Sequence, residues 1–132
     1  IGFSKDYNNF ELRKAIGEKD QLKAYKIIDY FAQNPNDNPL VVTTSLVFGF
    51  FLQLLQYHGL KDKSQMNAAK VLKVNPYFIK DYEVAFRNYP MKKVSTIVAA
   101  LREIDVKSKG VGASSMSQHD LLKELLINIF SA

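Results

Sequence analysis

Few residues in this chain have the types and spacing that catalysis requires. None of its six glycines begins a loop that continues into Gly-Lys-Ser/Thr, so there is no P-loop and ATP hydrolysis by this chain is not expected. His58 and His119 are far apart in the sequence, and neither has carboxylates at metal-ligand spacing. The chain has no cysteine, which rules out a disulfide framework and a thiolate metal site. We therefore predict no catalytic, cofactor-binding or metal-binding residue, and a protein that is not an enzyme.

Two pairs of carboxylates are the remaining candidates for acid–base chemistry. Asp81 lies two positions before Glu83, and Glu103 lies two positions before Asp105. Side chains at that spacing on a helix point to different sides. We expect all four to be solvated surface charges. The serines fall at helix caps or in a loop, so the sequence identifies no nucleophile with an adjacent base.

Positive charge is concentrated in one part of the chain. Residues 61–109 carry eleven lysines and arginines against five aspartates and glutamates, a local net of +6, whereas the whole chain carries +5. A basic surface can bind a phosphate backbone by releasing counterions, and such binding weakens as salt rises. The alternative is an ordinary solvated lysine face. Only three of the eighteen basic residues are arginines, which disfavours direct reading of bases.

Four lysines in this stretch are our candidates for DNA contact: Lys92, Lys93, Lys107 and Lys109. Lys107 and Lys109 are predicted to lie where a helix ends and a Gly/Ser loop begins, a position from which side chains can reach phosphates without reading bases. Their alternative role is structural, because cations also stabilise the negative end of a helix dipole.

The aromatic residues offer a second kind of candidate surface. Seven tyrosines and nine phenylalanines could stack on single-stranded bases, but most of them fall at inward helical positions and are expected in the core. Tyr77 and Tyr89 border helix breaks. We predict that these two serve at a subunit interface or in base stacking, or else pack internally.

Hydrophobic spacing predicts a single all-α domain over residues 1–132. Apolar residues recur at helical spacing, and no segment shows the alternation of a strand. The predicted helices begin at about residues 9, 20, 39, 64, 76, 90 and 117, and the predicted breaks between them lie at Gly17, residues 34–39, Gly59, residues 74–75, residues 89–90 and Gly110. A chain of 132 residues can bury one hydrophobic core. We therefore predict a compact helical bundle of about six to seven helices.

Particular residues are expected to mark the ends of these helices. Asn9 is predicted to cap the first helix and Gly17 to end it. Asn38 is the predicted cap of the third helix, with Pro39 in its first position and Gly59 at its end. The other predicted end residues are Asp20, Ser64, Asn75, Pro76, Pro90, Gly110 and Ser117.

One segment needs a membrane interpretation to be weighed. No charged residue occurs between Asp37 and Lys61, and residues 40–55 approach the length of a bilayer span. Several polar residues interrupt this segment, and the rest of the chain is basic and amphipathic. A helix that is apolar on most sides also suits the centre of a helical bundle. We therefore predict a buried central helix, with Phe51 in the core, and keep a membrane span as the alternative.

Several short motifs resemble those of one known family. An Ala-rich helix leads through an Asn-Pro break into an aromatic helix, and a basic amphipathic helix follows. The motifs are Asn67–Leu72, Asn75-Pro76, Tyr82–Tyr89, Leu101–Gly110, and further Tyr7–Leu12, Ala15-Ile16, Lys23–Ile28 and Asp120–Leu126. Together they resemble the C-terminal domain of the delta subunit of the bacterial DNA polymerase III clamp loader, over nearly the whole chain.

This resemblance implies a non-catalytic oligomerisation domain. In that family the C-terminal helical domains of five subunits pack side by side into a collar, and the ATP sites belong to partner subunits. The chain would then be the collar domain of a longer protein, without that protein's N-terminal clamp-binding, AAA+-like modules. Expected partners are the other clamp-loader subunits and, in the assembled complex, primed DNA, with no cofactor, membrane or small-molecule substrate. The expected location is the bacterial cytoplasm, in association with the nucleoid.

A different class of function remains as the alternative. Residues 65–89 have the pattern of a helix-turn-helix DNA-binding module, with Ala68 and Ala69 in the first helix and a turn at Val74-Asn75. The second helix would carry Lys80 and Arg87. However, it also carries acidic residues that oppose the approach of phosphates, so the collar interpretation is preferred.

Overall fold

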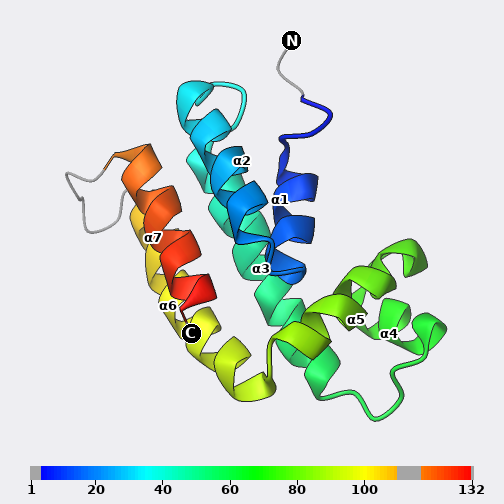
Figure 1. Ribbon diagram of the computed structural model, residues 1–132. Helices are drawn as coiled ribbons and strands as arrows, with labels where there is room; N and C mark the ends of the chain where they lie inside the picture. The colour runs from blue at the N-terminus through cyan, green and yellow to red at the C-terminus, as the bar shows by residue number, and fades with distance from the viewer. Residues whose placement is uncertain (1–3, 110–116, 132) are drawn as a thin grey trace.

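The protein is entirely helical where its structure is described. The computed structural model describes residues 4–109 and 117–131, and these residues form helices and connections without a strand. The elements are α1 (Asn9–Gly17), α2 (Gln21–Gln33), α3 (Leu40–His58), α4 (Gln65–Leu72), the 3₁₀ turn η1 (Pro76–Phe78), α5 (Ile79–Asn88), α6 (Met91–Ser108) and α7 (Gln118–Phe130) (Figure 1). The predicted all-α class is confirmed.

The long apolar helix α3 is the centre of the bundle. It packs against α1, α4, α5, α6 and α7, and it runs antiparallel to α6 (Figure 1). Its inner face buries Val47, Phe50, Phe51 and Leu54 completely or nearly so. By length and composition alone α3 could cross a membrane, but the core helix of a bundle passes the same test. The contacts of α3 on several sides match the predicted central helix.

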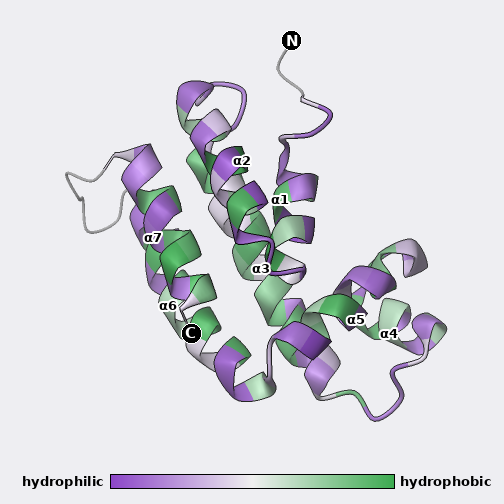
Figure 2. Cartoon of the chain, viewed as in Figure 1, coloured by the Kyte–Doolittle hydropathy of each residue, from purple (hydrophilic) through white to green (hydrophobic). Residues whose placement is uncertain are grey.

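The outer helices bury one apolar stripe each. α2 packs against α1 and α7, and α7 also packs against α6, so helices from both halves of the chain form one core. These helices carry both hydrophobic and hydrophilic residues along their length (Figure 2), and the residues buried in α2 and α7 are all apolar. In α2 the buried stripe is Ala24, Ile27, Ile28 and Phe31, as the helical spacing predicts.

Side-chain caps begin most of the helices. The predicted caps at Asp20, Ser64, Asn75 and Ser117 all accept a hydrogen bond from a backbone N–H two or three residues later. Two predicted caps were wrong by one residue. Asn8 caps α1, and Asn9 lies inside the helix, where its side chain accepts a hydrogen bond from Thr43 Oγ1. Pro39 occupies the N-cap position of α3, while Asn38 is buried and its side-chain amide donates to Asn34 O.

Lysines, not glycines, adopt the left-handed backbone conformation at two chain reversals. Lys19 follows α1 with a φ of 57°, and Lys73 ends α4 with a φ of 59°. Gly17, which was predicted to end α1, is the last residue of that helix and is buried. The predicted end of α6 at Gly110 lies outside the described residues, and Lys109 occupies the C-cap position.

Candidate functional site

The titratable groups of the described residues form no reaction centre. No three His, Cys, Asp or Glu side chains in residues 4–109 and 117–131 come close enough to hold a metal ion. His58 Nε2 lies 2.7 Å from the carbonyl oxygen of Tyr89, and His119 Nε2 lies 2.9 Å from Asp29 Oδ1. Each histidine therefore links two helices or their ends. The search for a functional site moves to surfaces.

The four lysines predicted to contact DNA lie at the two ends of α6. Lys92 and Lys93 are in its first turn, and Lys107 and Lys109 are in its last turn and cap. A helix rises about 1.5 Å per residue, so Lys93 and Lys107 are separated by about 20 Å along the axis. The structure therefore forms two basic pairs and not a single patch.

Lys107 and Lys109 make ion pairs within the domain. Lys107 Nζ lies 3.6 Å from Glu124 Oε2 on α7, and Lys109 Nζ donates to Asp105 Oδ2 at 2.9 Å. Asp105 was predicted to be a solvated charge, which is wrong: it is only 9% exposed, and Ser45 Oγ also donates to its Oδ1. The end of α6 could be predicted from the sequence. That Asp105 faces inward could not, because its environment depends on the position of α3. These contacts agree with the structural alternative for the two lysines.

Lys92 and Lys93 have a different environment. Both are exposed, and none of the ion pairs found among the described residues includes them. They occupy the first turn of α6, where the helix dipole is positive and cations are unfavourable by about 0.3–1 kcal/mol each. Pro90 precedes them as the N-cap, without a side-chain cap bond. Positive potential is therefore concentrated at this helix end.

Tyr89 is an internal residue, so of the alternatives predicted for it the structure shows internal packing. Its side chain is 1% exposed, and its hydroxyl donates a hydrogen bond to the carbonyl oxygen of Ile16 at 2.7 Å. Its ring meets the edge of Phe51 with centroids 5.4 Å apart. Burial raises the pKa of Tyr89 well above its ordinary value, so the hydroxyl stays protonated and keeps its role as donor.

Tyr77 remains available at the surface. It is 61% exposed in η1, and Lys80 Nζ lies 4.3 Å from the centroid of its ring. Its ring also meets Phe78 in an edge contact, with the two centroids 5.4 Å apart. Tyr77 and Tyr89 both border a helix break in the sequence, and only the packing of the helices distinguishes them.

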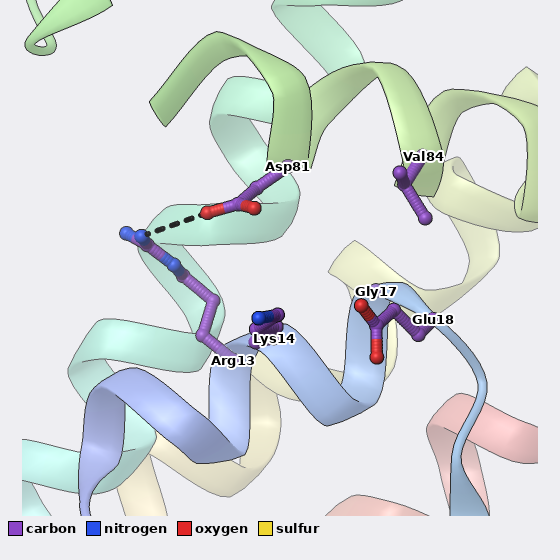
Figure 3. Close-up of a pocket in the computed structure, with 6 residues that line it drawn as sticks. All are labelled: Arg13, Lys14, Gly17, Glu18, Asp81 and Val84. Atoms are coloured by element: carbon purple, nitrogen blue, oxygen red, sulfur yellow. Dashed lines mark ion pairs between the residues drawn. The ribbon is translucent and has the colours of Figure 1, made fainter. Parts of the chain in front are cut away.

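Arg13 is a candidate that the sequence analysis did not single out. Its side chain extends from α1 toward Asp81 on α5, and the two side chains face each other in Figure 3. Arg13 Nη2 lies 3.7 Å from Asp81 Oδ2, which is an ion pair too long for a good hydrogen bond. Its Nε and Nη2 groups are buried without a hydrogen-bond partner.

Three aromatic rings from different elements surround the Arg13 guanidinium. Its central carbon lies 5.2 Å from the ring centroid of Phe10, 5.7 Å from that of Phe50 and 5.1 Å from that of Phe78. Such cation–π contacts contribute about 0.5–2 kcal/mol each. Leaving a buried donor without an acceptor costs about 1–3 kcal/mol, and the contacts with the three rings offset this cost. The sequence gives no signal for this cluster of rings around Arg13. Arg13 is a single arginine on an amphipathic helix, and the three rings come from α1, α3 and η1.

Two hollows adjoin Arg13 on the outside of the bundle. One, of about 340 Å³, is lined by Arg13, Ser45, Leu46, Gly49, Phe50, Leu52 and Gln53. The other, of about 140 Å³, is lined by Asn9, Phe10, Arg13, Leu46 and Val47. They share Arg13 and Leu46, so an apolar depression runs between α1 and α3 with a cation beside it.

The helix-turn-helix alternative corresponds to α4, η1 and α5. Ile79, Tyr82 and Ala85 of α5 are buried, and the exposed positions include Lys80, Glu83 and Arg87. An acid therefore lies between the two basic residues on the face that would approach DNA. This geometry offers no specific support for base reading.

Comparison with known families decides the relationship. The family model described as "DNA polymerase III delta subunit, C-terminal domain" matches residues 6–129. The chain belongs to this family. The match begins before α1 and ends in the last turn of α7, so every helix of this delta C-terminal domain contributes to it. No curated protein and no solved structure gives a significant match.

Membership in the delta family places the domain in the clamp loader of bacterial DNA replication. This family is a non-catalytic component of the clamp loader. It implies other clamp-loader subunits as partners and a cytoplasmic location. This favours the predicted collar interpretation over a free-standing DNA reader. The function of the delta domain is therefore expected to depend on its surfaces and not on a reaction centre.

Proposed function

We propose that this domain holds the delta subunit in the clamp loader. Its helices pack against the C-terminal domains of neighbouring subunits in a collar of five subunits, and the assembly supports loading of the sliding clamp onto primed DNA. The observation that carries the proposal is the family match over residues 6–129, on a domain whose central helix α3 leaves apolar side chains such as Leu46 exposed. The domain's own mechanism is structural, and ATP hydrolysis belongs to partner subunits.

The proposal is tested by removing the domain from full-length delta. We expect truncated delta to lose co-elution with the other purified clamp-loader subunits in size-exclusion chromatography, because the domain supplies the packing surface. Circular dichroism of the truncated protein checks that the remaining modules stay folded. Co-elution of a folded, truncated delta at the same concentrations as the full-length protein would contradict the proposal.

We further propose that the domain contributes to DNA binding by the assembled complex through the Lys92–Lys93 pair. These lysines are exposed at the positive end of the α6 dipole, where they cost stability and add to the positive potential. Lys107 and Lys109 form ion pairs with acidic residues of the domain, and these carboxylates lower the positive potential that the two lysines present to solvent. Of the four predicted contacts, the pair at the start of α6 is therefore the better phosphate site.

Charge reversal at the two ends of α6 should give opposite results. The Lys92→Glu/Lys93→Glu variant is expected to weaken primed-DNA binding by the complex several-fold at low salt, with a smaller loss as salt rises. Its melting temperature should stay equal or rise slightly, because glutamates suit a helix N-terminus. The matched Lys107→Glu/Lys109→Glu variant should instead lower the melting temperature. Unchanged DNA affinity of Lys92→Glu/Lys93→Glu at low salt would exclude a contact there.

A further inference from the structure

The outward side of α3 carries a row of apolar side chains that the described residues of the domain leave exposed. Val42, Leu46 and Leu52 are 45%, 49% and 40% exposed, and Phe10 of neighbouring α1 is 42% exposed. Single exposed apolar residues are ordinary, but a contiguous apolar surface marks an interaction site. We call this surface, made by Phe10, Val42, Leu46, Gly49 and Leu52, the α3 outer face.

Gly49 makes a notch in the α3 outer face. A Cβ atom added at Gly49 would meet no atom within 4 Å, so the space above the helix is open. Gly49 lies within a regular helix, where glycine is less favourable than other residues and its backbone conformation does not need it. The 340 Å³ hollow is lined by Gly49 together with Leu46 and Leu52. A glycine at this position lets the backbone of another element approach closely.

Arg13 indicates the charge of the group that fits beside this notch. Both hollows of the α3 outer face are lined by Arg13, and neither is lined by a carboxylate. The Arg13 side chain is 21% exposed, and its ion-pair partner Asp81 lies 3.7 Å from Nη2, too far for a good hydrogen bond. A carboxylate is the acceptor that matches a guanidinium in charge and shape. The complementary partner is therefore apolar with an acidic group.

We propose that the α3 outer face receives a helix of a neighbouring clamp-loader subunit, which places apolar side chains over Gly49 and Leu46 and a carboxylate against Arg13. The proposal rests on the proposed assembly function and assigns it to one surface. A second copy of this chain is the poorer occupant, because a two-fold contact would bring two Arg13 cations together without a carboxylate from either lining.

The experiment uses full-length delta and the other purified clamp-loader subunits, with binding measured by titration. Gly49→Gln fills the notch, and Leu46→Glu places an acid on the apolar surface. We expect each to weaken the binding of delta to the other subunits by about tenfold or more. The matched control is Ile127→Glu, at a 55% exposed position on α7, which should bind like the natural protein. Gly49→Gln should not lower the melting temperature of delta, since glutamine is the better helix former.

Arg13→Lys tests the carboxylate, because lysine keeps the charge but cannot make the paired hydrogen bonds of a guanidinium. Weaker binding of Arg13→Lys, with the fold retained in circular dichroism, supports the proposal. Natural affinity of folded Gly49→Gln and Leu46→Glu overturns it. If deletion of the whole domain also leaves binding intact, the assembly function itself has failed. If the variants change only self-association of delta in sedimentation, or only its binding to anionic lipid vesicles, the occupant is a second copy or a membrane, and the proposal is wrong.

Discussion

Replacing Phe51 with alanine is expected to lower the free energy of unfolding by about 3–5 kcal/mol, as for other large-to-small changes at buried aromatic residues. Phe51 has no exposed surface, and it lies on the central helix. Its ring meets Phe50 at a centroid distance of 5.5 Å and Tyr89 at 5.4 Å, both in edge contacts. The cavity left by alanine would therefore open between α3 and the start of α6.

Urea titration of the domain, followed by circular dichroism, measures this loss. Leu52→Ala is the matched control, because Leu52 is the next residue of α3 and is 40% exposed. Its truncation should change stability far less than that of Phe51, since partly exposed positions lose less burial. A loss below about 1 kcal/mol for Phe51→Ala would mean that the core is not centred on this residue.

Tyr89→Ala is expected to cost a similar 3–5 kcal/mol. Tyr89 connects three parts of the fold, because its hydroxyl donates to Ile16 O on α1, its ring packs on Phe51 of α3, and its own backbone joins α5 to α6. Tyr89→Phe separates the hydroxyl from the ring. It should cost only about 0.5–1.5 kcal/mol, the contribution of one hydrogen bond. In a double-mutant cycle, Phe51→Ala and Tyr89→Ala should be non-additive, because the two rings touch.

The pH dependence of stability gives an independent check on Tyr89. Burial raises the pKa of Tyr89 in the folded state above its value of about 10 in the unfolded chain. The raised pKa favours folding fully below pH 10, and this contribution is lost progressively as pH rises above 10. Tyr89→Phe should therefore lose less stability between about pH 9 and pH 11 than the natural domain. Equal slopes in the two proteins, from thermal melts, would place the Tyr89 hydroxyl in solvent.

Local chemistry in the sequence determined the helices and several of their ends. Asp20, Ser64, Asn75 and Ser117 cap helices because a short polar side chain can accept a hydrogen bond from its own chain two or three residues later. The helical spacing of apolar residues likewise identified the buried stripe of α2 and the central role of α3. The family motifs were also readable, since they depend on residue order. Asn8 and Pro39 were missed by one residue, because adjacent polar or proline residues are equivalent candidates for a cap.

The exposed surfaces were decided only by the tertiary structure. Tyr77 and Tyr89 flank equivalent breaks in the sequence, yet one is 61% exposed and the other 1%. Asp105 turns inward because Ser45 of α3 lies within reach of it, sixty residues earlier in the chain. Arg13 is surrounded by rings from α1, α3 and η1, which no local pattern could bring together. Periodicity defines which side of a helix is apolar. Whether a neighbouring element covers that side depends on contacts between residues far apart in the chain.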